Sequence, residues 1–89
     1  MTTRRYRIEL KPSAAKSLAR LPVDLQQRLV RAVETLAGDP RPHGVVKMAG
    51  DDNLWRVRVG DFRIVYEIHA DVLLVMVLRI GHRREVYRG

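Results

Sequence analysis

The sequence predicts an α+β domain in which a hairpin of two helices packs on a small antiparallel sheet, in the order β-α-α-β-β-β. Two observations indicate this fold class. Apolar residues recur at helical spacing between residues 12 and 38, whereas residues 54–80 alternate between apolar and polar or run continuously apolar, as strands do. A chain of 89 residues has room for one core, so we expect residues 1–89 to form a single domain.

The first half of the chain predicts a strand followed by two helices. Residues 6–10 alternate in polarity and predict the strand, and Pro12 or Ser13 is suited to open a short helix. Pro22 separates this helix from the second one. The second helix carries an apolar stripe at spacings of four, four and three, which predicts its core-facing residues: Leu25, Leu29, Val33 and Leu36.

The second half of the chain predicts strands joined by turns. Gly38, followed by Asp and Pro, is expected to end the second helix as a left-handed cap, and residues 45–48 are expected to form a short edge strand. The apolar run at residues 72–80 predicts a longer strand, which a basic tail follows. The short turn before this run leaves its register open by one residue, and with it the face on which Arg79 lies.

A two-residue hairpin is predicted within residues 54–68. The pair Gly60-Asp61 separates two alternating runs, and a glycine in the first position favours the tight turns typical of hairpins. A loop of this length fixes the register, so Arg58 should face Arg63 across the strands. One face is then apolar and belongs to the core: Trp55, Val57, Val59, Phe62, Ile64 and Tyr66. The other face carries Arg56, Arg58 and Arg63.

The expected pair of Arg58 and Arg63 is unfavourable for folding alone, because like charges directly opposite each other destabilise a sheet. An anionic ligand such as a phosphate, held by several guanidinium groups, would account for the pair. The alternative is an exposed basic face with Glu67 or Asp61 as counter-charge, since arginine stems also cover apolar surface. We favour the ligand site.

The composition indicates a polyanionic partner, either a nucleic acid or an acidic protein. The formal net charge is +7, and 14 of the 17 basic residues are arginine, whose flat fork of donors matches phosphate oxygens. The lack of cysteine excludes disulfides and thiolate metal sites, and no histidine–carboxylate cluster has metal-site spacing, so we expect no metal or cofactor. No apolar run is long enough to span a bilayer, and we expect a cytoplasmic protein without membrane contact.

The basic tail adds candidates for the same site. Residues 79–88 hold four arginines, one histidine and one tyrosine against one glutamate. Tyrosine stacks on bases or transfers protons. His82 is a reserve acid or base because histidine titrates near neutral pH, and a solvent-exposed tail histidine is the alternative. We expect Lys47, His82 and Arg84 to contribute to substrate binding.

Four segments together resemble the RelE/ParE superfamily of bacterial toxins. They are Leu21-Pro22 between the helices, residues 39–42 (Asp-Pro-Arg-Pro), the hairpin segment 54–68, and residues 78–87 (Leu-Arg-Ile-Gly-His-Arg-Arg-Glu-Val-Tyr). This ordered set covers nearly the whole chain. RelE-like members cut messenger RNA, typically in the ribosomal A site, whereas ParE-like members inhibit DNA gyrase and lack the nuclease residues.

The resemblance implies a catalytic set, because each position of the RelE-like pattern is occupied: Arg56, Arg58, Arg63, Arg83 and Tyr87. It implies a toxin of a type II toxin–antitoxin system, a ribosome-dependent endoribonuclease that works by metal-free attack of the ribose 2′-hydroxyl. The first two positions are often lysine in such enzymes. Arginine is always charged and suits charge stabilisation better than base catalysis. A ParE-like gyrase inhibitor and an inactive basic domain are the alternatives.

The resemblance also implies partners. A small antitoxin with an acidic toxin-binding segment would cover the basic face. Messenger RNA in the ribosomal A site would be the substrate, and DNA would be reached only through the antitoxin.

Overall fold

The structure, a computed structural model, describes residues 5–50 and 53–82. In this part of the chain, two helices and five strands follow one another, with one 3₁₀ turn before the last strand. Their bounds are β1 Arg7–Leu10, α1 Pro12–Ala19, α2 Val23–Gly38, β2 Val46–Lys47, β3 Leu54–Val59, β4 Phe62–His69, the 3₁₀ turn Ala70–Val72, and β5 Leu74–His82.

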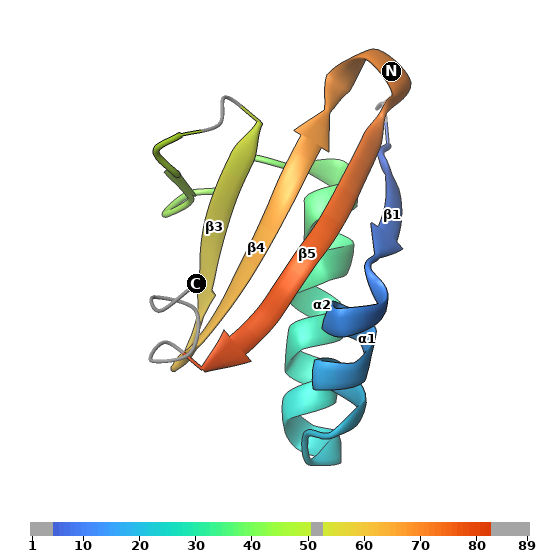
Figure 1. Cartoon of the computed structure of the whole chain (residues 1–89), viewed down its shortest axis with the longest axis vertical. Coiled ribbons are helices and arrows are strands. Elements are labelled where there is room, and N and C mark those ends of the chain that lie inside the picture. The colour runs from blue at the N-terminus through green and yellow to red at the C-terminus, as the bar shows by residue number, and fades with distance from the viewer. Residues whose placement is uncertain (1–4, 51–52, 83–89) are drawn as a thin grey trace.

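The strands form one sheet in the order β1-β5-β4-β3-β2, and both helices lie on the same face of it (Figure 1). The predicted α+β class, with a helix hairpin on a sheet, is confirmed. The sheet is mixed rather than wholly antiparallel, because β1 pairs with β5 in parallel. A parallel pair needs a crossover, and here the helices and the following strands bring the chain back beside β1. We call the face without helices the open face.

The core lies between the helices and the sheet. Leu29, Val33 and Leu36 of α2 are at most 6% exposed, as their stripe predicted, whereas Leu25 is only partly buried. The largest fully buried side chains of the sheet are Tyr66, Ile64, Ile80, Val75 and Val77. The other apolar residues of the hairpin also pack against this core: Trp55, Val57, Val59 and Phe62. The predicted apolar face of the hairpin is therefore confirmed.

The end of α2 differs from the expectation. Gly38 is the last residue of the helix and is not left-handed, and Asp39 follows in an extended conformation with φ −148°. The backbone N–H of Asp39 still donates to the carbonyl of Thr35 at 3.0 Å. Pro40 cannot continue the helix. Its carbonyl accepts a 2.6 Å hydrogen bond from the buried Tyr66 hydroxyl, which ties the end of α2 to β4.

Candidate functional site

Three arginines come together on the open face of the hairpin formed by β3 and β4. The strands pair in the predicted register, with Arg58 directly opposite Arg63 and Arg56 opposite Val65. Gly60 has φ +59°, the left-handed conformation that the first position of such a turn requires and that glycine adopts without strain. The predicted opposition of Arg58 and Arg63 is therefore confirmed.

Arg63 is the only buried charged side chain among the described residues, at 5% exposure. Its Nη1 donates to the carbonyl of Phe62 at 3.4 Å. Its neighbours across the sheet are Arg58 in β3 and Gly81 in β5. A guanidinium keeps its proton at any working pH. Arg63 is therefore a permanent positive charge that is largely withdrawn from water.

β5 adds a fourth arginine to this face. The pairing of β4 with β5 contains a bulge: Tyr66 pairs with Val77, but Val65 pairs with Arg79. The extra residue between them, Leu78, shifts the alternation of β5 by one position, so Arg79 lies on the open face. The sequence left this face undecided. We call the four residues Arg56, Arg58, Arg63 and Arg79 the arginine half of the open face.

The other end of the open face is arranged differently. Strand pairing places Arg7 and Glu9 of β1 on this face, together with Glu67 and His69 of β4. Arg7 Nε donates to Glu9 Oε2 at 2.9 Å, and His69 Nε2 lies 3.0 Å from Glu67 Oε1. We call these four residues the paired half. Glu67, which the sequence offered as a counter-charge for the arginines, is engaged here with His69 instead.

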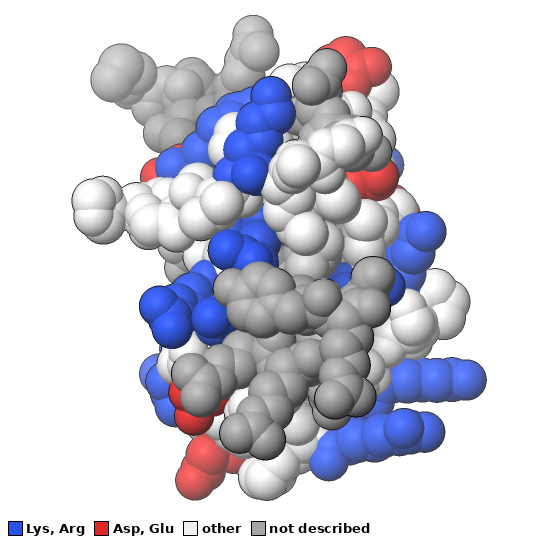
Figure 2. All heavy atoms as spheres, turned by 60° about the vertical axis from the view of Figure 1, so that its left-hand side comes forward, with Lys and Arg blue, Asp and Glu red and all other residues white. Residues whose placement is uncertain are grey.

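No acidic residue is directly opposite any of the four arginines on the described strands, where the paired positions other than arginine hold Val46, Val65 and Gly81. Glu67 is the nearest acid along β4, at a position diagonal to Arg56 and Arg79. The side chains of Arg58 and Arg79 make no hydrogen bond or ion pair within the described part of the chain. Lys and Arg side chains form a band on the β3 side of the molecule (Figure 2). The arginine half is thus a concentrated positive surface of the kind that attracts polyanions.

Two of the predicted binding residues lie on the other face of the sheet. His82 pairs with Phe62, a core-side residue, and the two rings meet edge to face with centroids 5.8 Å apart. Lys47 pairs with Trp55, which is also on the core side. The bulge in β5 determines the face of His82, and the register of β2 places Val46 beside Arg56. The structure therefore brings neither His82 nor Lys47 to the arginine half.

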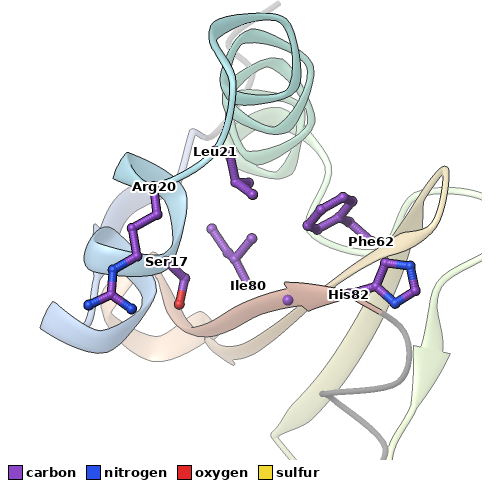
Figure 3. Close-up of a pocket in the computed structure, with 7 residues that line it drawn as sticks. Ser17, Arg20, Leu21, Phe62, Ile80 and His82 are labelled. Carbon is purple, nitrogen blue, oxygen red and sulfur yellow. The ribbon is translucent and has the colours of Figure 1, made fainter.

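His82 instead borders a recess of about 240 Å³ on the helix side of the sheet (Figure 3). Apolar side chains converge in its middle and polar ones stand around them (Figure 3). The lining consists of Ser17, Arg20, Leu21, Phe62, Ile80, Gly81 and His82. Because the sheet separates this recess from the open face, its polar groups do not act together with the arginine half.

The arginine half can stabilise negative charge, but its four guanidinium groups cannot exchange protons near neutral pH. The Tyr66 phenol is no substitute, because it faces the core and its burial raises its pKa above the usual value. The other predicted site residues, Arg83, Arg84 and Tyr87, lie outside the described residues, so their place in the site stays a prediction.

Neither a metal site nor a membrane span is found in the part of the chain that the structure describes. Within residues 5–50 and 53–82, no three His, Asp or Glu side chains are grouped so that they could hold a metal ion. The helices there are too short or too polar to cross a membrane.

Sequence comparison finds relatives along almost the whole chain. A model of the family described as the ParE toxin of the type II toxin–antitoxin system parDE matches residues 8–87. The chain is also 26% identical over 88 residues to a protein of Methanocaldococcus jannaschii that bears the name toxin RelE1. That match covers 96% of this chain and 98% of the relative.

Structure comparison finds the same fold in RelE toxins. A chain of the archaeal RelE–RelB complex from Pyrococcus horikoshii matches with a TM-score of 0.80 and 26% identity, over 89% of this chain and 96% of that one. The toxin–antitoxin complex RelBE2 of Mycobacterium tuberculosis gives 0.80 at 21% identity, over 92% and 95%. A mutant of the Escherichia coli toxin RelE in the free state gives 0.77 at 20% identity, over 94% and 92%.

Proposed function

The chain belongs to the RelE/ParE superfamily and is a toxin of a toxin–antitoxin system, and from this premise we propose that it is a ribosome-dependent endoribonuclease that cleaves messenger RNA. The observation that carries the proposal is the arginine half. Arg58 and Arg63 are held opposite each other although folding gains nothing from the pair. A phosphate bound at this face would offset the repulsion between the two positive charges.

The proposed reaction is a transesterification without a metal. The ribose 2′-oxygen loses its proton and forms a bond to the adjacent phosphorus, and the bond from phosphorus to the 5′-oxygen breaks. The 5′-oxygen takes up a proton, leaving a 2′,3′-cyclic phosphate and a 5′-hydroxyl. Negative charge builds up on the phosphorane between these steps, and preorganised donors aimed at it lower the barrier. Arg56, Arg58 and Arg63 are assigned this role.

The proton transfers are assigned to the tail. By resemblance to RelE-like enzymes, Arg83 would support the leaving 5′-oxygen, and Tyr87 would activate the 2′-hydroxyl or orient a base by stacking. His82 faces the core side of the sheet, so we give it no part in proton transfer. A site with strong charge stabilisation but no strong base would be slow alone, which fits an enzyme that depends on the ribosome to orient the RNA.

The proposed protein partner is a cognate antitoxin. The P. horikoshii and M. tuberculosis relatives were solved as complexes with their antitoxins, which supports such a partner here. With a net charge of +7, the toxin would favour an acidic antitoxin segment that covers the arginine half. DNA would be contacted only through the antitoxin. We place the activity in the cytoplasm, with the ribosome.

Inhibition of DNA gyrase is the second candidate, because the matching family is the one described as the ParE toxin. A gyrase inhibitor would bind a protein surface and carry out no chemistry. The two candidates therefore differ in whether toxicity leaves cut messenger RNA or damaged DNA.

Mapping of messenger 5′ ends in cells separates the candidates. Wild type, Arg63→Gln and Arg58→Thr are expressed, with Arg7→Gln of the paired half as the matched control. We expect new in-frame cuts within coding regions for wild type and Arg7→Gln, and few or none for the two arginine-half variants. Intact transcripts together with DNA damage would favour gyrase inhibition. Intact transcripts without growth arrest would point to an inactive basic domain. Copurification with the antitoxin checks that each variant folds.

A further inference from the structure

Arg79 is the one member of the arginine half that the resemblance to RelE-like enzymes does not assign. It is exposed, and its side chain makes no hydrogen bond or ion pair within the described residues. The bulge at Leu78 and the pairing with Val65 place it on the same face as the three hairpin arginines. Arg79 thus adds a fourth guanidinium to a surface on which three arginines are already assigned to one phosphate.

The four arginines are spread over three neighbouring strands rather than gathered at one point. Neighbouring strands lie about 4.8 Å apart, so Arg56 on β3 and Arg79 on β5, separated by Val65, have backbones about 10 Å apart. Arg63 is two positions along β4 from Val65, which puts its backbone roughly 8 Å from that of Arg79. Arg58 and Arg63, by contrast, are directly opposite each other. Arg79 therefore stands at one side of the Arg58–Arg63 pair.

One phosphodiester also offers too few acceptors for all four side chains. A bidentate guanidinium occupies both non-bridging oxygens of a phosphate, and each arginine carries five N–H donors. The proposed reaction already assigns Arg56, Arg58 and Arg63 to the scissile group. The donors of Arg79 are then available for acceptors on a neighbouring part of the ligand, and in a nucleic acid strand the next strong acceptor is the adjacent phosphate.

We propose that Arg79 binds a second phosphate of the RNA, next to the scissile one, and so makes the toxin select a strand with at least two consecutive phosphates over a single phosphodiester. This inference rests on the proposed function for its ligand. Arg79 is then a substrate-positioning residue: it holds the strand across β3, β4 and β5 while the hairpin arginines act on the scissile phosphate.

The test compares wild type and Arg79→Gln in binding to two 2′-O-methyl RNAs, which cannot be cleaved. One is a dinucleotide with a single phosphate, and the other is a longer single strand. Arg7→Gln is the matched control, since it removes the same charge from the same face but from an ion pair with Glu9. Binding is measured by fluorescence anisotropy over a range of salt concentrations.

We expect Arg79→Gln to weaken binding of the longer strand about ten-fold or more, as for loss of one charged hydrogen-bonded contact. The salt dependence of log K should become shallower by about 0.7, the value for one phosphate of a single strand. Dinucleotide binding should stay unchanged, and Arg7→Gln should alter neither. The inference is overturned if the longer strand binds Arg79→Gln as well as wild type, if the dinucleotide weakens equally, or if Arg7→Gln has the same effect.

A chemical variant of the strand identifies the phosphate. A neutral methylphosphonate replaces the phosphate next to the one expected at Arg58 and Arg63. This change should weaken wild type but cause no further loss in Arg79→Gln, and additive losses would contradict a direct contact. These assays measure binding and need no cleavage, so their results test the role of Arg79 independently of the proposed nuclease activity. If mapped transcripts show no cuts but Arg79→Gln still discriminates between the RNAs, only the nuclease proposal fails.

Discussion

The two halves of the open face differ in how their charged side chains are paired. In the paired half, Arg7 is joined to Glu9 and His69 to Glu67 at 2.9 and 3.0 Å. In the arginine half, Arg58 faces Arg63, and the described strand positions around them hold no acid. Both halves belong to the same sheet and face away from the helices (Figure 1).

This difference shows that folding alone accounts for the charged residues of the paired half but not for those of the arginine half. The Arg7–Glu9 ion pair and the contact of His69 with Glu67 give each of these side chains a partner, so the paired half needs no ligand. Like charges at directly opposite positions are unfavourable, so the pairing of Arg58 with Arg63 is not explained by folding, whereas the proposed phosphate site would explain it. Substitutions in the two halves should therefore have opposite consequences.

The largest effect is expected for Arg63→Gln. Loss of one preorganised donor of an anion-stabilising site typically slows catalysis about 10²- to 10³-fold. The measurement is the rate of messenger cleavage on purified ribosomes. Arg63→Lys, which keeps the charge but loses the planar fork, should recover part of the activity. Because Arg63 is 5% exposed, a thermal melt of each variant is needed as a folding control. Full activity of a folded Arg63→Gln would remove Arg63 from the site.

Gly60→Ala tests the turn that sets the register of the arginine half. A left-handed conformation costs a residue with a Cβ about 1–2 kcal/mol, and the added Cβ would lie 3.2 Å from Nη2 of Arg28. We expect the free energy of unfolding to fall by roughly that amount in a denaturant titration. Gly60→Asn should lose less, because asparagine tolerates this conformation better. Equal losses for both variants would show that contact with Arg28, rather than the backbone, decides the effect.

Arg58→Thr should separate stability from activity. Removing one of two opposed like charges is expected to stabilise the fold by about 0.2–1 kcal/mol, and threonine suits an exposed strand position. Cleavage should drop at the same time, because a donor to the phosphate is lost. Chemical denaturation and the ribosome assay measure the two effects. A variant that is both less stable and less active would mean that the arginine pair is not strained.

Arg7→Gln should have the smallest effect. The Arg7 and Glu9 side chains are 63% and 47% exposed, and an ion pair this open to solvent contributes about 0–1 kcal/mol. Stability and cleavage should therefore both stay close to wild type in the same assays. A clear loss of cleavage would extend the functional surface into the paired half and end the distinction between the two.

The hairpin could be predicted from the sequence because its structure is local. A two-residue turn between the alternating runs allows only one register of the two strands. Counting outward from the turn therefore predicts that Arg58 faces Arg63 and that Ile64 and Tyr66 lie on the apolar face. The apolar stripe of α2 could also be predicted, because it depends only on the spacing of residues within the helix.

Features that depend on distant or irregular pairing could not be predicted in the same way. Nothing in residues 7–10 indicates that their partner is β5 or that the pair is parallel. The turn before β5 contains Leu73 in a left-handed conformation with φ 51°. A leucine in an apolar run gives no signal for such a conformation. The bulge at Leu78 then decides the faces of Arg79 and His82. His82 was placed near the arginines from its sequence neighbours, and the alternation of β5 places it on the other side of the sheet.

The bulge has a consequence for how such genes can diverge. In β5, Val75 and Val77 face the core before the bulge, and Ile80 and His82 face the same side after it. The hydroxyl of Ser13 at the start of α1 donates to the carbonyl of the extra residue, Leu78, at 3.4 Å. One codon can be added or lost at this point while every flanking side chain keeps its face. An in-frame insertion or deletion elsewhere in β5 would exchange inside and outside for all residues after it. Leu78 is thus the position in β5 where descendants of a common ancestor can differ in length by one residue and still present the same surface.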